Sequence, residues 1–585
     1  MKAFFNRLKN DPRAKRFALI AAGAIGVLAL LFIILAIFTP RETTWPVSDH
    51  ASVLTMTIGL ANEPDTLFPL AAYMPESRLI LAAVYEPPLY AKQYIYRQGV
   101  LDSMPTLENG NTVLLGKPPK GDVGQDTRQI SQTFVLRDDL RWADTGEPVT
   151  SADLAYAYQL AQNPEVEIAF PELAMQIASA QASGPYSVNM QLKPGIIPPL
   201  YNTYVYPPLP SKQLANVNPG SLSFGEPSRR PVGYGPYQVM EWVPAEQIVL
   251  QRNNYYFRRS ESQPRVPYVV FKFMPDAKTR VQAVADGQLD VALGLGYEVI
   301  TDVLEAEQAG KIQAQFVPGQ TWEMLAFNLD DPILKDIRVR QAIAYGTDRQ
   351  SMVDKLLHGK VPVLNSWIPP DHPDYIGDAA IITYPYDPAK AKQLLDQAGW
   401  TMSGRFRAKD GQPLKLTMNA TQGDALREAY LKMFKENMAA IGVDVTVELL
   451  PASQWYAQGG KLTQRQFQLG IFPWVAAPDP GSAELWTSTS IPTDTNGYHG
   501  QNYFGWHNAD SDLIYKQLGQ TLNRGARHSL YARQQALVAQ ELPGLPLFQH
   551  VVMVAANPKL TGLKLDPTDL ITRNIYEWDI PLTTP

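Results

Sequence analysis

The sequence predicts an α/β fold made of several folding units. Segments with strand spacing alternate along the chain with segments of helical spacing, which is the pattern of strand–helix–strand units. Hydrophobic residues make up 45% of the chain and charged residues 18%, so a large core can form and general disorder is excluded. At roughly 100–200 residues per domain, the 585 residues correspond to about three to five folding units.

Strands and helices are expected at defined places. Apolar segments of strand length lie at 54–58, 133–136, 186–192, 248–251, 289–293, 414–418 and 443–449. Helical spacing is found at 276–286, 337–358, 388–398 and 425–440, and a further helix is expected to begin at 150–153. Asp153 follows Thr150 by three residues, near the capping-box pattern. Glycines close to the ends of the four longer helices suit their C-caps, namely Gly287, Gly359, Gly399 and Gly442.

The N-terminus has the pattern of a membrane anchor. Residues 17–38 are 22 residues without a charge, and at about 1.5 Å per residue they span roughly 33 Å, enough to cross a bilayer core. Residues 1–16 carry six cations, which the positive-inside rule keeps in the cytoplasm. The polar residues 39–51 would form a tether to an extracytoplasmic body. A cleaved signal peptide is the alternative, but the apolar segment is long and ends in a poor cleavage site at 36–40.

Charge and cysteine content exclude several classes of protein. The net charge is −6, but residues 1–16 alone carry +5, which leaves −11 on the remainder. An acidic body argues against nucleic-acid binding, which needs a basic face. The chain has no cysteine, so disulfides, iron–sulfur clusters, thiol catalysis, Cys-bound zinc and a lipidated cysteine are all excluded.

No motif predicts a catalytic, metal or cofactor site. None of the seven histidines forms H-E-x-x-H, and no G-x-S-x-G is present. The segment 110–118 fails as a phosphate loop, because five residues separate its glycines and Pro118 stands where a Ser or Thr would hold magnesium. Aromatic residues give the more specific signal. Trp474 ends an apolar segment that runs into a turn, where aromatic side chains suit a ligand cleft, although a place in the core is the alternative.

Several segments together resemble the bacterial extracellular solute-binding protein family 5, the oligopeptide- and dipeptide-binding components of ABC importers. The similar segments, in the family's order, are 58–69, Tyr85-Glu-Pro-Pro-Leu89, 134–153, Pro231-Val-Gly-Tyr-Gly-Pro-Tyr237 with 252–256, Gly287-Gln-Leu-Asp290, 327–349 and 386–400. In the third of these, Thr145 is inserted relative to the family pattern. The resemblance covers about residues 54–550.

The resemblance implies a periplasmic-binding-protein-like body of three lobes that close on a ligand about a hinge. Lobe I would comprise 52–88, 222–295 and 549–585, lobe II 89–221, and lobe III 296–548. Such a protein is a monomer that catalyses nothing and needs no cofactor. It captures oligopeptides and delivers them to ABC permease subunits whose ATPases lie in the cytoplasm.

One departure from the family concerns the ligand. Peptide-binding relatives often carry W-x-x-D, whose Asp pairs with the peptide's α-ammonium, and Ala477 stands at that position here. Either Asp479 or Glu63 would have to replace it, since an unpaired buried ammonium is costly. The expected ligand-binding residues are Glu63, Trp474, Val475, Asp479 and Tyr503.

Other functions stay open. The ligand could be a non-peptide solute such as a nickel chelate, a glycoside or an opine-like compound. A membrane-anchored extracellular hydrolase and a signal receptor fit less well, because the chain lacks a nucleophile motif and only about 16 residues would be cytoplasmic.

The N-terminal pattern gives the first testable prediction. Residues 17–38 should stay on the mature protein, because the apolar segment is long enough to span a bilayer behind six cations. Intact-mass measurement of the protein from the membrane fraction checks this. A mature chain that starts near residue 40 would show cleavage instead.

Overall fold

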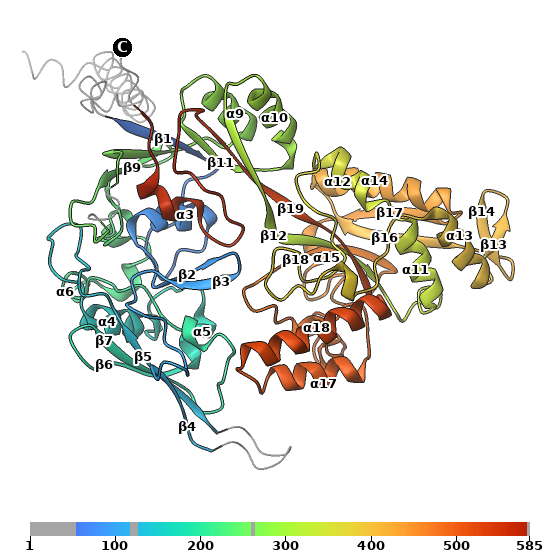
Figure 1. Ribbon diagram of the computed structural model, residues 1–585, viewed down its shortest axis with the longest axis horizontal. Coiled ribbons are helices and arrows are strands. Elements are labelled where there is room, and N and C mark those ends of the chain that lie inside the picture. Colours follow the sequence, from blue (N-terminus) through green and yellow to red (C-terminus); the bar gives the residue numbers. More distant parts are fainter. Residues whose placement is uncertain (1–53, 118–126, 259–263, 582–585) are drawn as a thin grey trace, which may run out of the picture. The chain divides into compact units, whose positions relative to one another are not determined.

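The computed structural model describes residues 54–117, 127–258 and 264–581 (Figure 1). The predicted basic segment 1–16, anchor 17–38 and tether 39–51 all lie outside these ranges. Within the described ranges, no helix combines the length and apolar character needed to span a membrane. From Thr55 on, the described residues belong to one compact unit.

A ten-stranded mixed sheet runs through this unit. Its strands, in spatial order, are β17 (Asp444–Leu450), β16 (Lys415–Thr421), β18 (Leu469–Val475), β12 (Gln313–Phe327), β19 (Gly544–Ala556), β11 (Val291–Leu295), β1 (Thr55–Leu60), β10 (Tyr268–Phe273), β9 (Gln247–Arg252) and β8 (Tyr237–Val243). The strands expected at 54–58, 248–251, 289–293, 414–418 and 443–449 are therefore confirmed.

Two long antiparallel strands, β12 and β19, join the two halves of this sheet. The first part of β12, up to Pro318, pairs with 551–556, and its second part, from Trp322, pairs with 544–549. The register shifts between Pro318 and Trp322, so the ladder is interrupted in the middle. On its other edge, the end of β19 that pairs with the first part of β12 also pairs with β11. The second part of β12 pairs on its other edge with β18. The sheet is therefore continuous in hydrogen bonding but has one irregular crossing.

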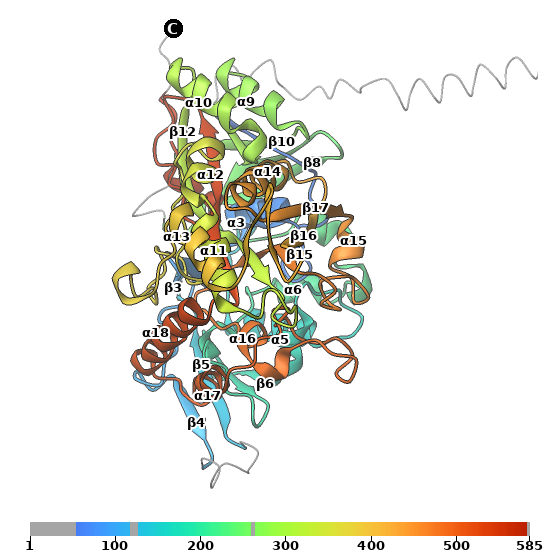
Figure 2. The ribbon, with the colours of Figure 1, turned by 90° about the vertical axis from the view of Figure 1, so that its right-hand side faces the viewer.

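Helices cover each half and bury separate cores. One core contains residues of α9 (Ala277–Ala285), α10 (Ile300–Gln308) and β11. A second is built from α11 (Ile337–Gly346), α13 (Pro388–Gln397), α14 (Ala425–Ala440) and the β16 side of the sheet. A third, rich in Trp, includes residues of α17 (Ala509–Leu518) and α18 (Arg524–Glu541), which lie side by side (Figure 2). The second and third cores lie on opposite faces of the same strands, because alternating residues of β12 and β18 belong to one core or the other.

A second, four-stranded antiparallel sheet lies within residues 89–221. Its order is β4 (Thr112–Leu115), β5 (Gln129–Val135), β7 (Ser187–Leu192) and β6 (Ile177–Ala182). The helix α4 (Ser151–Ala161) contacts β6 and β7, and Thr150 caps it through the predicted box with Asp153. A short hairpin of β2 (Leu89–Lys92) and β3 (Ile95–Gln98) precedes this sheet.

The prediction of a single helix at 337–358 is wrong, because the segment is divided into two helices. The chain forms two helices, α11 and α12 (Arg349–Leu356), separated by an extended Thr347. Asp348 caps the second helix by accepting a hydrogen bond of 2.9 Å from the Ser351 N–H. The break also lets the buried Arg349 guanidinium donate to the carbonyl of Pro546 at 2.8 Å. Apolar spacing continues across such a break, so periodicity alone could not locate it.

A buried carboxylate ties the crossing strands to α14. Glu323 of β12 is 1% exposed, and it accepts hydrogen bonds from Arg427 at 2.6 Å, from His550 of β19 at 2.9 Å and from Tyr430 at 3.0 Å. Burial by itself would raise the pKa of Glu323, but His550 and Arg427 outweigh it and lower the pKa below its usual value. The charged carboxylate is therefore the stabilised form.

Removal of this carboxylate should destabilise the fold. Glu323→Ala should lower the free energy of unfolding by about 3–5 kcal/mol, because Arg427, His550 and Tyr430 all lose their acceptor. Arg427 then keeps only the more exposed Asp424, 3.3 Å away, as an ionic partner. Glu147→Ala is the control, since Glu147 forms a surface pair with Lys212 and should matter by at most about 1 kcal/mol. Denaturant titration of both variants measures the difference.

The same network predicts a direction of pH dependence. The pKa of Glu323 is lower in the folded chain than in the unfolded one. The contribution of Glu323 to the free energy of unfolding is therefore complete at pH values above its ordinary pKa of 4.5, and it is lost as the pH falls through the pKa of the folded state. The difference in stability between wild type and Glu323→Ala should therefore shrink in acid. A difference that is constant from pH 7 to pH 3 would contradict this assignment.

Candidate functional site

A cavity of about 460 Å³ lies beside the helix α3 (Pro75–Val84). One wall is formed by α3 and the segment 85–91, and another by residues 568–573, which lie nearly 500 positions later in the sequence. Phe170 and Pro207 contribute from the region of the four-stranded sheet. Gln320, from the irregular part of β12, and Pro478, from the loop after β18, complete the lining. Segments that lie far apart in the sequence, at 69–96, 170, 207, 320, 478 and 568–573, therefore meet at this cavity.

The position of α3 is fixed by a close approach of the backbone. The Gly235 N–H donates to the Val84 carbonyl at 2.7 Å, at the end of the helix. A Cβ atom on Gly233 would lie 2.1 Å from that carbonyl oxygen, so only glycine fits there. Both glycines belong to the Pro-Val-Gly-Tyr-Gly-Pro segment singled out in the sequence. That segment thus places the wall of the cavity, and its role is structural.

Three charged residues line the cavity, and two of them form a pair. Arg573 donates from Nε to the Asp569 carboxylate, and its guanidinium lies 3.8 Å from the centre of the Tyr90 ring. Burial raises the pKa of Asp569 to about 6, although the neighbouring Arg573 lowers it in part. The third charged residue, Arg78 of α3, is exposed.

The loop after β18 is held against β12 at this point. The Ala476 N–H donates to the Gln320 carbonyl at 2.9 Å, and the Gln320 side chain donates back to the Ala476 carbonyl at 3.0 Å. This reciprocal pair fixes Pro478 in the cavity wall. A movement at the crossing strands would therefore carry one side of the cavity with it.

Trp474 and Val475 lie at a smaller cavity of about 20 Å³, whose lining also includes His372 and Ala477. The Trp474 ring is partly buried and meets Phe472 edge to face, with centroids 5.8 Å apart. Its Nε1 is buried and has no hydrogen-bond acceptor among the described residues. Val475 is 67% exposed. These two predicted residues, which are neighbours in the sequence, lie just before the loop that leads to the larger cavity.

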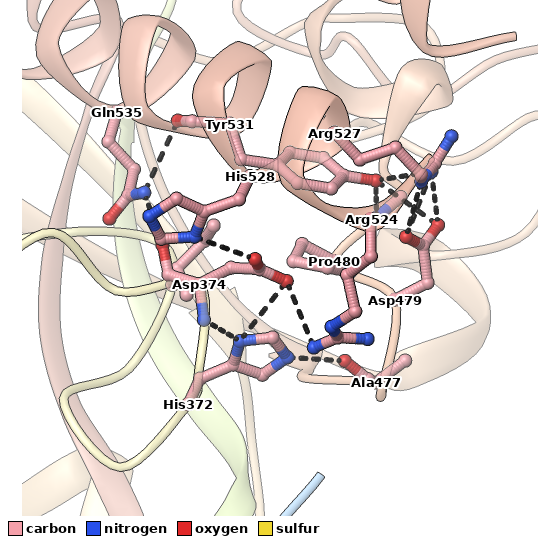
Figure 3. A network of polar contacts seen from close by, with 12 residues as sticks. His372, Asp374, Ala477, Asp479, Pro480, Arg524, Arg527, His528, Tyr531 and Gln535 are labelled. Carbon is pink, nitrogen blue, oxygen red and sulfur yellow. Dashed lines mark hydrogen bonds and ion pairs between the residues drawn. The ribbon is translucent and has the colours of Figure 1, made fainter. Parts of the chain in front are cut away.

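Asp479 has a partner inside the protein. Its carboxylate accepts two hydrogen bonds from Arg527 Nη2, at 2.7 and 2.8 Å, and one from the Tyr531 hydroxyl at 3.1 Å (Figure 3). Both charged side chains are largely buried, with 15% and 9% exposed. Figure 3 shows the carboxylate facing α18, while the carbonyl of Ala477 lies 3.0 Å from Nε2 of His372.

The remaining two predicted residues also contact protein groups. Glu63 accepts from Trp242 Nε1 at 2.7 Å and from the Ala245 N–H at 3.0 Å. Tyr503 packs edge to face on Phe472, with centroids 5.5 Å apart. Neither lies among the residues that line the 460 Å³ cavity. Reasoning from the sequence missed Arg78 and the segment 568–573, although two segments that it singled out, 58–69 and Tyr85-Glu-Pro-Pro-Leu89, contribute Pro69, Tyr85 and residues 87–89 to the lining.

The hairpin next to the cavity reaches into the Trp-rich core. Tyr94, at the tip between β2 and β3, has a φ of 61° and is fully buried among residues that include Trp322 and Trp367. Its ring lies 4.6 Å from that of His372. Burial is the main cause that raises the pKa of Tyr94. The hairpin therefore carries a cavity wall on β2 and a buried anchor at its tip.

The contacts of Asp479 predict a structural effect for its substitution. Asp479→Asn should lower the free energy of unfolding by about 1.5–3 kcal/mol, because Arg527 loses a charged partner in a buried place. Asp510→Asn on the surface of α17 is the control and should stay within about 0.5 kcal/mol of wild type. Thermal and denaturant unfolding measure both. Selective loss of free-amine peptides over N-acetylated ones would instead give Asp479 the role of an ammonium partner.

Comparison with known proteins agrees with this architecture. The family model described as "Bacterial extracellular solute-binding proteins, family 5 Middle" matches residues 122–496. The nickel-binding periplasmic protein of Escherichia coli is 27% identical over 444 residues, which cover 74% of this chain and 81% of that protein. The oligopeptide-binding protein AppA of Bacillus subtilis is 26% identical over 446 residues, 74% of this chain and 78% of that protein.

Solved structures show the same fold. NikA from Brucella suis in complex with Fe(III)-EDTA superposes with a TM-score of 0.70 at 23% identity, over 90% of this chain and 100% of that one. The periplasmic-binding-protein-like α/β fold that the resemblance implied is thereby confirmed. Since the family model matches more than half of the sequence, the chain belongs to the bacterial extracellular solute-binding proteins of family 5.

Proposed function

We propose that this protein is the solute-binding subunit of an ABC importer, and that it captures a peptide or another small solute in the 460 Å³ cavity. The observation that carries the proposal is the composition of the cavity wall. The helix α3 and the segment 568–573 contribute from one side of the β12–β19 crossing. Gln320 lies at the crossing itself, and Pro478 lies on its other side. The volume falls within the usual range of about 300–1,000 Å³ for small-molecule pockets.

Closure of the protein on its ligand would occur about the irregular crossing of β12 and β19. The register shift between Pro318 and Trp322 interrupts the ladder there, and such a place can absorb a change of backbone angle. The proposed lobes are 52–88 with 222–295 and 549–585, then 89–221, and then 296–548. A ligand that touches Pro478 and α3 together would favour the closed state, since those contacts are lost on opening.

The relatives suggest two chemical classes of ligand. One relative is named for oligopeptides and another for nickel, so a peptide or a metal chelate fits the same scaffold. Trp474 and Val475 are proposed to contact the part of the ligand that extends toward the smaller cavity. Asp479 and Glu63 are committed to protein groups, so their part in the site would be to hold its surroundings in place.

The rest of the proposal follows from the family and the N-terminal pattern. Residues 17–38 would anchor the protein, with its body on the extracytoplasmic side and a permease as its partner. The protein would act as a monomer and catalyse no reaction, with ATP hydrolysis in separate cytoplasmic subunits.

Binding should be visible as a ligand-dependent gain in stability. Native mass spectrometry of the full-length protein should show a co-purified small molecule, and adding it back at about 100 times its Kd should stabilise the fold by about 2.7 kcal/mol. Ala91→Trp should abolish this gain, because Ala91 lines the cavity and the larger ring would fill it. The matched control is Ala215→Trp on an exposed position, which should keep the gain. Equal gains in both variants would place the ligand elsewhere.

A further inference from the structure

The side chains that line the 460 Å³ cavity carry more positive than negative charge. Its charged lining residues are Arg78, Asp569 and Arg573, so two cations stand against one anion and the net charge is +1. Asp569 is already paired with Arg573 and is 10% exposed. Within the described ranges, the Arg78 guanidinium has no ion pair or hydrogen bond to another residue, although its backbone N–H belongs to α3. One positive charge at the cavity is therefore left without a protein partner.

Hydrogen-bond donors also exceed free anionic acceptors there. The terminal nitrogens of Arg573 donate to no other side chain of the described residues, since its hydrogen bond to Asp569 uses Nε. Tyr96 lines the cavity, and burial raises the pKa of its hydroxyl, so this side chain is a neutral donor. The one carboxylate of the lining is occupied by Arg573. Such a surface suits a ligand rich in acceptors.

A partner for a ligand ammonium is missing from the same surface. Ala477, which lines the smaller cavity, stands where peptide-binding relatives often have Asp, so that position supplies no carboxylate. The carboxylates of Asp479 and Glu63 bind Arg527 and Trp242 respectively, and neither lines the cavity. An ammonium enclosed here would lose its hydration and would meet only Asp569, a carboxylate already paired with Arg573, so its burial is costly.

We propose that the cavity takes a solute that carries a carboxylate and no free ammonium, and that Arg78 receives this carboxylate. The inference rests on the function proposed above and specifies the substrate class of the same cavity. A guanidinium can hold a carboxylate through two parallel hydrogen bonds, which gives orientation as well as affinity. The carboxylate can come from the C-terminus of a short peptide with a blocked amine, or from a non-peptide acid.

The experiment is equilibrium dialysis of the full-length protein, freed of co-purified ligand, against an equimolar mixture with mass-spectrometric readout. The mixture contains trialanine, N-acetyl-trialanine, the amides of both, and citrate. The carboxylate probes without an ammonium, N-acetyl-trialanine or citrate, should be retained at least about 10-fold over the amides. Trialanine itself should be weaker than its N-acetylated form. Preference between N-acetyl-trialanine and citrate tells which source of the carboxylate the cavity takes.

Substitution of Arg78 distinguishes a direct contact between its guanidinium and the ligand carboxylate from a long-range effect of the net charge. Arg78→Gln should weaken the retained carboxylate probe by about 10- to 100-fold and leave its uncharged amide unaffected. Arg78→Lys should recover part of the loss, because it restores the charge without the planar pair of donors. Arg97→Gln removes an exposed charge from the neighbouring strand β3, outside the cavity lining, and should change retention by less than about 3-fold.

Three results would overturn the inference. Retention of the amides as strongly as the acids would remove the charge assignment and leave the importer function in place. Equal losses in Arg78→Gln and Arg97→Gln would show that only the net charge matters. Retention of no probe would also count against it, and the co-purified solute would then decide separately whether the importer function stands.

Discussion

The antiparallel pairing of β12 with β19 is the constraint on which the rest of the structure depends. Each half of the large sheet is hydrogen-bonded to one end of this pair, through β11 on one side and β18 on the other. Glu323 sits on β12, 1% exposed, and binds His550 across the pair and Arg427 of α14. A single pair of strands thus sets the relation between the separately packed cores and carries a charged network that needs every partner.

The cavity is a consequence of this arrangement. Its walls come from α3, from the segment 568–573, and from Gln320 and Pro478 near the crossing. None of these segments would form a site alone, since each contributes a few side chains to a surface assembled from distant positions. The glycines at 233 and 235 matter for the same reason, because they let the backbone approach the end of α3 and so fix one wall.

Local signals in the sequence predicted much of the fold. The strand β16 and the helix α14 appear where spacing and a terminal glycine placed them, and Thr150 caps α4 as its neighbour Asp153 indicated. The break at Thr347 was missed because Asp348 begins a new helix without interrupting the apolar spacing. The site was harder to predict, because it depends on contacts between positions far apart in sequence. Asp479 illustrates this: its partner Arg527 lies 48 residues away, and nothing in the local sequence reveals the pairing.

The buried Tyr94 has a consequence for the speed of ligand exchange. The hairpin that contributes Leu89, Tyr90 and Ala91 to the cavity also places Tyr94 in the Trp-rich core. Withdrawal of that ring would expose on the order of 150–250 Å² of aromatic surface. An opening that withdraws the ring is therefore unfavourable by the free energy of exposing this surface, so Tyr94 stabilises the docked hairpin. Tyr94 does not line the cavity, but its N–H donates to Thr568 of the lining at 3.3 Å, so a change at Tyr94 should alter both residence time and affinity through the docked hairpin.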